Sequence, residues 1–291
     1  MLEHLESTPT RPARVVVIGA GGFVGGAIAR RFAADGVTVL ALTRVELDLL
    51  QPDAAARLKG LLRPTDSVVF VSALAPAKTV PLLMQNLRMA EAACAALAET
   101  EIAHLLYVSS DAVYADDANP VTERSPLAPS TLHGMMHAAR ESMLRASTRA
   151  PFAALRPTLI YGAADPHNGY GPNRFRRRAE RGEPIAIFGE GEERRDHVAI
   201  EDVAALAALM LARRSAGALN AATGRSISFR EVAETVAAQF GGRVPVESRP
   251  RQGTPPHLAH RHFDIAGCHR AFPRFRFTPL AEGLRHAMQG S

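Results

Sequence analysis

The chain of 291 residues is poor in cysteine and in aromatic residues. Its two cysteines, Cys94 and Cys268, imply no disulfide framework and favour a reducing compartment, so we expect a cytoplasmic protein. Tryptophan is absent and aromatics make up 5%, which leaves no stacking platform for nucleic acid although the net charge is +5. No apolar run reaches the ~18 residues that a membrane-spanning helix needs. We therefore expect partners other than nucleic acid or membrane.

The first 13 residues lack the apolar segment of a secretory signal and carry both acidic and basic groups. We expect residues 1–13 to form a short mobile leader. In the whole chain, 47% of residues are hydrophobic and 22% are charged, which are ordinary globular values. The length allows one large α/β domain, alone or with a smaller one.

From Arg14 onwards, short aliphatic runs alternate with segments of helical periodicity. They predict strands over 15–18, 37–42, 67–71, 104–108 and 152–155, and helices over 23–34, 53–62, 81–99 and 134–149. The predicted strands are apolar throughout, which is typical of a parallel sheet with helices on both faces. The sequence therefore predicts an α/β fold with a Rossmann-type doubly wound sheet over residues 14–160.

The second half, residues 161–291, differs in composition from the first. Residues 161–173 are rich in Gly, Pro and Asn and predict a long functional loop, and residues 243–279 are irregular with several prolines. The pattern also predicts a basic helix at 175–182, a strand at 185–188 and helices over 201–214 and 228–240, the last with a capping box at Ser228. We expect this half to form a small substrate-binding cap interleaved with the sheet domain.

A glycine-rich turn, GAGGFVG at residues 19–25, joins the first predicted strand to the first helix. Glycines in this position allow a tight turn and a close approach of backbone N–H groups to a pyrophosphate, and the helix N-terminus adds partial positive charge. A strand–turn–helix context makes the motif specific for a dinucleotide, although a turn without a ligand is the alternative. We expect contacts from Gly19, Gly22, Phe23, Val24 and Gly25.

The end of the second predicted strand bears on the choice of dinucleotide. An acid that binds the adenosine ribose is usual there, but this chain has Thr43 and Arg44. A guanidinium binds a ribose 2′-phosphate in a bidentate way, which favours NADP over NAD. A solvated surface arginine is the alternative interpretation.

Four later motifs have characteristic spacing: SSDAVY at 109–114, LRP at 155–157, YG at 161–162 and RD at 195–196. With the glycine turn, they resemble the extended short-chain dehydrogenases/reductases of the NAD-dependent epimerase/dehydratase family over nearly all of residues 14–288. The resemblance implies cofactor contacts from Asp48, Leu49, Ser72, Ala73 and Asn86. It also implies a nucleotide-sugar substrate and a homodimer through the helices at 81–99 and 134–149.

Substrate contacts are expected on the cap side. The resemblance implies that Arg195 contacts the substrate's diphosphate. Tyr161 is a candidate substrate contact at the border of the site, with a packing residue as the alternative. Asn173 and the arginines between 174 and 181 form a candidate anion clamp with Arg195. A solvated basic helix face is the alternative for that segment.

The catalytic centre departs from the family pattern. Its Tyr-x-x-x-Lys reads His133-Gly-Met-Met-His137 here, and Ser110 keeps the position that binds the reacting oxygen. Histidines at i and i+4 share a helix face, and an imidazole titrates near pH 6–7 without a tuning lysine. We therefore expect Ser110, His133 and His137 to act together, with His133 as proton donor or acceptor and His137 as cofactor anchor.

Three alternatives remain for this centre. A zinc site would need a third ligand, which is not evident nearby, so we expect no metal. A Ser110–His133 nucleophile–base pair would need an orienting carboxylate. A decayed site would leave a catalytically silent dinucleotide-binding protein, a redox sensor or a scaffold. The leading hypothesis is an NADP-preferring enzyme that reduces, epimerises or dehydrates a nucleotide-activated sugar.

Overall fold

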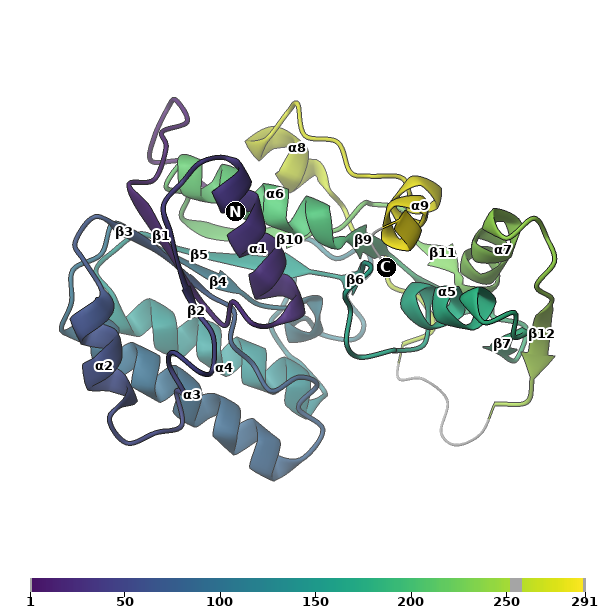
Figure 1. Ribbon diagram of the computed structural model, residues 1–291, viewed down its shortest axis with the longest axis horizontal. Helices are drawn as coiled ribbons and strands as arrows, with labels where there is room; N and C mark the ends of the chain where they lie inside the picture. The colour runs from purple at the N-terminus through teal and green to yellow at the C-terminus, as the bar shows by residue number, and fades with distance from the viewer. Residues whose placement is uncertain (1, 252–257, 290–291) are drawn as a thin grey trace.

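A six-stranded parallel sheet forms the centre of the computed structural model, which describes residues 2–251 and 258–289 (Figure 1). Its strands are β1 (Arg14–Ile18), β2 (Val39–Leu42), β3 (Asp66–Phe70), β4 (His104–Val108), β5 (Phe152–Pro157) and β10 (Gly217–Ala221). Their order is β10-β5-β4-β3-β1-β2. Strand β2 lies on one side of β1 and β3 lies on the other, so the direction in which strands are added to the sheet reverses between β1 and β3. Ligands of doubly wound sheets bind at such a switch point, and the predicted fold class is confirmed.

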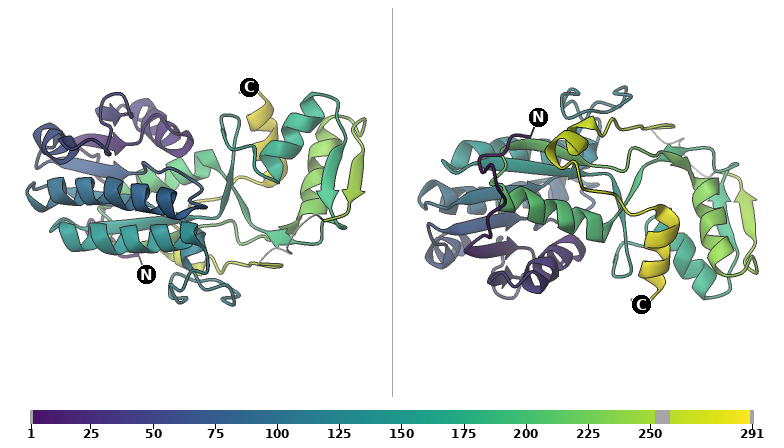
Figure 2. Two further views of the ribbon diagram at one scale, coloured as in Figure 1. Left: turned by 90° about the horizontal axis from the view of Figure 1, so that it is seen from below. Right: turned by 90° about the horizontal axis from the view of Figure 1, so that it is seen from above.

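Helices cover both faces of the sheet (Figures 1 and 2). One face carries α1 (Phe23–Ala34), α6 (Ile200–Ala212) and α8 (Ala266–Ala271), and the other carries α2 (Ala54–Leu61), α3 (Val80–Ala98) and α4 (Leu132–Ser147). Successive residues of β1 enter opposite cores: Val15 and Val17 pack with Ile28 of α1, whereas Val16 packs with Leu58 of α2. Both faces of the sheet are buried beneath helices, which explains why the strands are apolar throughout.

A smaller lobe lies beyond the carboxyl ends of the central strands (Figures 1 and 2). It contains α5 (Pro172–Glu180), α7 (Phe229–Gln239), α9 (Leu280–Gln289) and the parallel pair β7 (Ile185–Phe188) and β12 (Val246–Arg249). Its own core forms around Phe175, Phe229 and Val232. Two short pairs connect the lobe to the sheet: β6 (Leu159–Tyr161) with β9 (His197–Ala199), and β8 (Arg194–Arg195) with β11 (Ile227–Ser228). The predicted capping box of α7 is present at Ser228.

Three features of the structure differ from the sequence expectations. Strand β10, which the periodicity did not predict, comes from the second half and completes the sheet beside β5. The stretch 243–279 contains β12 and α8, while its residues 252–257 lie outside the described residues. The expected leader packs against the sheet domain: Glu3 pairs with Ala216, and His4 contacts the Ser215 hydroxyl at 2.8 Å.

None of the helices within 2–251 and 258–289 has the length and apolar character needed to cross a membrane.

His197 is a buried histidine between the sheet and the smaller lobe. It is 4% exposed, neither ring nitrogen has a hydrogen-bond partner among the described residues, and its ring centroid lies 5.7 Å from that of Phe229. Burial lowers the pKa of His197 to about 3, so the ring is neutral in the folded protein. The unfolded chain binds a proton near pH 6.5 instead.

We predict that His197→Phe makes the protein less sensitive to acid. Because the folded pKa is depressed, the contribution of His197 to stability is present above pH 6.5 and is lost as pH falls towards 3. Phenylalanine fits the aromatic surroundings and removes two unsatisfied nitrogens, so the free energy of unfolding from urea titration should fall less between pH 7.5 and 5 than in the unmutated protein.

His104→Phe is the matched control. The Nε2 of this buried histidine contacts the Ser215 carbonyl at 2.7 Å, and burial lowers the pKa of His104 to about 4. Its replacement should cost stability at pH 7.5 because it leaves that carbonyl unsatisfied. An equal acid-induced loss in His197→Phe and the unmutated chain would contradict the prediction.

Candidate functional site

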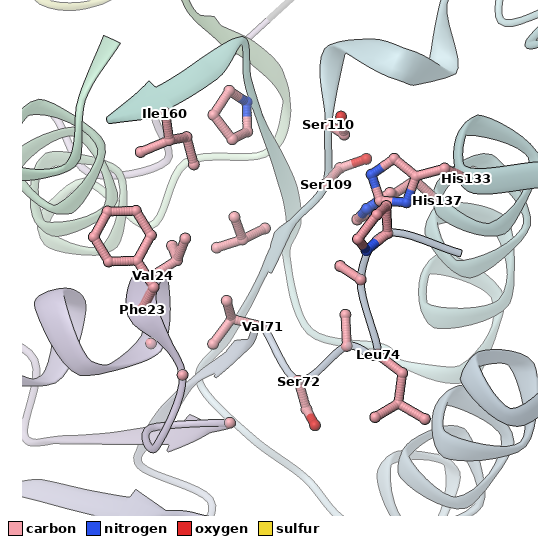
Figure 3. Close-up of a pocket in the computed structure, with 18 of the residues that line it drawn as sticks. Phe23, Val24, Val71, Ser72, Leu74, Ser109, Ser110, His133, His137 and Ile160 are labelled. Atoms are coloured by element: carbon pink, nitrogen blue, oxygen red, sulfur yellow. The ribbon is translucent and has the colours of Figure 1, made fainter. Parts of the chain in front are cut away.

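A cavity of about 970 Å³ opens at the carboxyl ends of β1 to β5. The glycine turn, the end of β2 and the chain after β3 form one part of its wall, and the ends of β4 and β5 and the start of α4 form the other. Figure 3 shows Phe23, Val24 and Ile160 on one side, with Ser110, His133 and His137 across from them. The cavity therefore brings together the predicted phosphate-binding turn and the predicted catalytic residues.

The glycine turn is held by close backbone contacts. Gly19 has φ +100°, and a Cβ there would lie 2.6 Å from the backbone of Ser72. A Cβ on Gly25 would lie 2.1 Å from the Gly19 carbonyl oxygen. Helix α1 starts after Gly22 without a side-chain cap or an acidic residue in its first turn. Because its first N–H groups lack intrahelical partners and border the cavity, the turn fits the pyrophosphate of a dinucleotide.

The end of β2 carries an acid that the sequence analysis missed. The Thr43 amide donates to the Glu46 carboxylate at 2.9 Å, and the Thr43 hydroxyl also contacts it; these bonds hold the pKa of Glu46 below its usual value. The guanidinium of Arg44 is 75% exposed and pairs with Asp48 at 3.2 Å. Thr43, Arg44, Asp48 and Leu49 all line the cavity. The expected 2′-phosphate ligands thus have carboxylate partners of their own.

The chain after β3 forms the neighbouring wall through Ser72 and Ala73. Asn86 does not line the cavity and stands behind it on α3. Its Oδ1 accepts from the Leu74 amide at 2.9 Å, and its Nδ2 donates to the Leu74 carbonyl at 3.0 Å. Asn86 therefore holds the shape of this wall from behind.

Ser110 lies in the cavity wall at the end of β4. Its Oγ accepts from the Ala112 amide at 3.2 Å and donates to Asp111 at 3.4 Å. Burial raises the pKa of Asp111, against the opposing effect of Arg261 and Arg195. The Arg261 guanidinium is 3% exposed and donates to the Asp111 carbonyl at 3.0 Å. Two cations, Arg195 and Arg261, therefore reach the cavity beside Ser110.

The first two turns of α4 place both histidines in the cavity wall. Thr131 caps the helix by accepting from the Gly134 amide at 3.1 Å, and a Cβ on Gly134 would lie 2.0 Å from the Ala112 carbonyl oxygen. This contact brings α4 against the segment that carries Ser110. The rings of His133 and His137 meet edge to face with centroids 4.7 Å apart (Figure 3).

Both imidazoles are uncharged at neutral pH. Burial lowers the pKa of His133, with a further decrease from His167, and burial lowers the pKa of His137 well below its usual value, with further decreases from His133 and Arg140. The expected ionisation near pH 6–7 is therefore displaced downwards. The Ala77 amide donates to His133 Nδ1 at 3.4 Å, so the neutral ring carries its proton on Nε2. In this form His133 is a hydrogen-bond donor.

Two predicted substrate contacts lie outside the cavity wall. Tyr161 is buried against α9, where a Cβ on Gly283 would lie 2.0 Å from its hydroxyl. Asn173 accepts from the Gly162 amide at 3.1 Å and donates to Asp165 at 2.9 Å. None of residues 173–181 lines the cavity, because α5 packs into the core of the smaller lobe. Of the predicted anion clamp, only Arg195 is placed at the cavity.

Several residues of the site escaped the sequence analysis. Tyr107 and Arg140 lie behind the cavity wall, and Arg261, His167 and Asp111 line it. A signal for Arg140 was available, because positions 133, 137, 140 and 141 fall on one face of a helix and all are polar. Within residues 2–251 and 258–289, no group of three His, Cys, Asp or Glu side chains has the geometry to hold a metal.

Comparison with known proteins identifies the family. Residues 15–222 match the NAD dependent epimerase/dehydratase family. The chain belongs to this family. It is 30% identical over 191 residues to the 2-alkyl-3-oxoalkanoate reductase of Shewanella oneidensis, an alignment that covers 56% of this chain and 49% of the reductase. The aligned part thus spans about half the length of that relative.

Solved structures share the fold over nearly the whole chain. UDP-glucose 4-epimerase of Thermotoga maritima, solved with UDP-glucose, has a TM-score of 0.84 and 20% identity and covers 95% of this chain and 97% of its own. UDP-glucose 4-epimerase of Thermus thermophilus, solved with NAD, has a TM-score of 0.80 and 24% identity, with coverages of 95% and 98%. The NDP-hexosamine 5,6-dehydratase TunA has a TM-score of 0.81 and 21% identity, covering 95% and 97%.

We predict that Gly25→Ala disrupts the glycine turn. The added methyl group would meet the Gly19 carbonyl at 2.1 Å, so α1 must move away from the turn after β1, at a cost of ~1–3 kcal/mol in the free energy of unfolding. Dinucleotide binding, measured by calorimetry, should weaken with it. Gly60→Ala in α2 is the control: nothing lies within 4 Å of its Cβ, so it should gain about 0.5–1 kcal/mol. Unchanged stability in Gly25→Ala would refute the packing role.

Proposed function

We propose that this protein is an NAD(P)-dependent oxidoreductase that transfers hydride at a carbon of a nucleotide-activated sugar, as a reductase, epimerase or dehydratase. One observation carries the proposal: a single cavity joins the uncapped start of α1 to Ser110 and two neutral imidazoles. Relatives of the same fold were solved with UDP-glucose and with UDP-glucuronic acid and NAD, which supports this substrate and cofactor class.

The dinucleotide would lie along the glycine turn. The N–H groups of Phe23 and Val24 would hold its pyrophosphate beside Gly22, whose own N–H donates to the Gly19 carbonyl at 3.1 Å. Ser72 and Ala73 would border a ribose, and Asp48 with Leu49 would border adenine. His137 would donate to the second ribose. When bound, the dinucleotide accepts or supplies the hydride. The residues of the chain orient it and exclude water from the carbon that reacts.

His133 and Ser110 would hold the reacting oxygen. A neutral imidazole that donates from Nε2 stabilises negative charge on a carbonyl oxygen as hydride reaches the adjacent carbon. The same ring donates a proton outright only in its cationic form, which is favoured as pH falls towards its lowered pKa. The Ser110 hydroxyl, next to the half-buried Asp111, adds a second polar contact.

The substrate would enter from the side of the smaller lobe. Arg195 and Arg261 line the cavity there, and their guanidinium groups suit a diphosphate. Arg261 reaches the Asp111 and Asp116 carboxylates only at 3.9 Å, so an anionic ligand would meet little competition from them. His167 extends the same wall.

We also propose a homodimer in the cytoplasm. Three apolar side chains at the start of α3 and α4 are exposed, namely Val80, Met84 and Met135, and they support a dimer through these helices. The two cysteines are free thiols, which supports a reducing compartment.

A catalytically silent dinucleotide-binding protein is the second candidate. The replacement of both the tyrosine and the lysine by histidine favours it, since neither ring is charged at neutral pH. A silent protein would bind dinucleotide but turn over no nucleotide sugar. The proposed enzyme would turn over at least one.

We predict a preference for NADP(H) of about 1.5 kcal/mol, roughly tenfold in Kd by calorimetry. An exposed pair such as Arg44–Asp48 contributes at most about 1 kcal/mol, so a 2′-phosphate can displace Asp48. Arg44→Ala should abolish the preference. Glu46→Gln should enlarge it, because a carboxylate beside the phosphate is removed.

Arg31→Ala is the control for charge removal, because Arg31 forms a similar exposed pair with Asp35 on α1. It should leave the NADP/NAD ratio unchanged. Equal or tighter binding of NAD(H) to the unmutated protein would contradict the assignment of Arg44.

We predict that His133→Ala lowers kcat by about 10²–10³, the usual cost of removing one donor to a developing oxyanion. His133→Gln keeps an N–H donor and should retain more of the rate than His133→Ala. The rate of carbonyl reduction should rise as pH falls below 6.5, since the pKa of His133 is lowered. Turnover of a panel of UDP- and dTDP-sugars with NADPH or NADP measures both effects.

His262→Ala, an exposed histidine, controls for nonspecific loss. Equal rates for His133→Gln and His133→Ala would reject the donor role. If no nucleotide sugar is turned over and none shifts Tm in the presence of cofactor, the substrate class fails; a 2-alkyl-3-oxo acid tests the alternative suggested by the Shewanella relative.

A further inference from the structure

Arg140 is a buried cation behind the cavity wall. It lies on α4, is 0% exposed, and forms no ion pair among residues 2–251 and 258–289. Its neighbour Glu141 is engaged by Arg156, at 2.9 and 2.7 Å. A buried charge without a counter-ion costs several kcal/mol, so its presence calls for a compensating role.

The guanidinium of Arg140 is held by uncharged groups, among them the Met136 sulfur at 3.6 Å. It donates to the Ser72 carbonyl at 2.6 Å and lies over the rings of Phe70 and Tyr107, with its Cζ 4.5 and 5.4 Å from their centroids. Its Nε has no partner in the described structure. None of these contacts neutralises the charge. The positive field of Arg140 therefore reaches the groups beside it, which include His137 one turn earlier on α4.

Tyr107 connects Arg140 to His137. Its hydroxyl lies 2.7 Å from His137 Nδ1, and its side chain is fully buried on β4. Burial raises the pKa of Tyr107 to about 12, so the phenol keeps its proton, while the pKa of His137 is well below its usual value and the ring is neutral. The phenol is then the donor and Nδ1 the acceptor, which leaves the proton of His137 on Nε2.

We propose that Tyr107 and Arg140 are positioning residues for His137. The phenol fixes His137 in the tautomer that donates from Nε2, and the guanidinium supplies from behind the wall the positive charge that a neutral imidazole at this position lacks. The assignment of the Nε2 donor to a cofactor ribose rests on the proposed function. The tautomer and the field do not depend on it, because they follow from contacts within the chain.

The titratable and charged groups that face His137 come from two elements, β4 and α4. Tyr107 faces it from β4, while His133 and Arg140 lie on its own helix. Cys94 of α3 lies near Arg140, and burial raises the pKa of this thiol, so it carries no charge. Glu141 also acts on Tyr107, but its carboxylate is turned to Arg156. Of these groups, Arg140 is the source of positive charge at His137.

The test is the NMR titration of the full chain, labelled with ¹³C and ¹⁵N in histidine and free of cofactor. The His137 resonance is identified by its loss in His137→Gln. In the unmutated protein we expect an Nε2–H tautomer and no titration between pH 8 and 5.5. Tyr107→Phe should convert the ring to a mixture of tautomers. Arg140→Met should raise the titration midpoint by roughly one pH unit, since a nearby like charge is removed.

Two controls separate field from packing. Arg140→Lys keeps the charge, so His137 should stay neutral over the same range even if the change weakens packing. Arg145→Met removes an exposed cation of the same helix that lies over Phe152, and should leave His137 unchanged. If Arg140→Met does not fold, the Tyr107→Phe tautomer and the Arg140→Lys titration still decide the question.

An Nδ1–H tautomer in the unmutated protein would overturn the role of Tyr107. An unchanged midpoint in folded Arg140→Met, or a raised midpoint in Arg140→Lys, would overturn that of Arg140. Absence of turnover or of dinucleotide binding in the unmutated chain is a different outcome: it refutes the proposed function, while the tautomer and titration results keep their meaning.

Discussion

The close contact between the glycine turn and the chain after β3 fixes the geometry of the cavity. Gly19 can approach the backbone of Ser72 only because it has no side chain, and Gly25 lets α1 close on the turn in the same way. On its other side, the carbonyl of Ser72 accepts from Arg140 of α4. Ser72 is thus the point where the half that carries the glycine turn and the helix that carries the histidines are tied together. A shift of either half would be transmitted to the other through this backbone.

Short-range patterns predicted most of the fold and one side of the site. The glycine turn, the apolar strands and the capping box at Ser228 depend on neighbours within a few residues, and each is readable from the chain. Contacts across long separations were not readable. Tyr161 matched a linear motif and Asn173 adjoined a basic segment, but contacts with α9 and with Asp165 decide where these two side chains point. One short-range contact was also missed: the Glu46 carboxylate accepts from the amide of Thr43, only three residues away.

The histidine pair changes how charge is arranged in a dinucleotide site. A tyrosine and a lysine would bring one weak acid and one permanent cation to the surface of the cavity. Here the surface carries two neutral rings in edge-to-face contact, and the cation lies one layer deeper at Arg140. Burial opposes protonation of both rings, and at His137 the positive charge of Arg140 opposes it further. Such a site favours hydrogen-bond donation over proton exchange at neutral pH.

The position of β10 has a consequence for synthesis of the chain on the ribosome. Strands β1 to β5 are complete once Pro157 has emerged, but the outer edge of β5 stays unpaired until Gly217–Ala221 follow. Residues near the N-terminus also lack their partner until then, since Glu3 pairs with Ala216. During that interval the nascent chain exposes the apolar edge of β5, which is buried in the complete fold. This edge can pair with another copy of the chain. Chaperone protection and a steady rate of elongation through this stretch would therefore bear on the yield of folded protein.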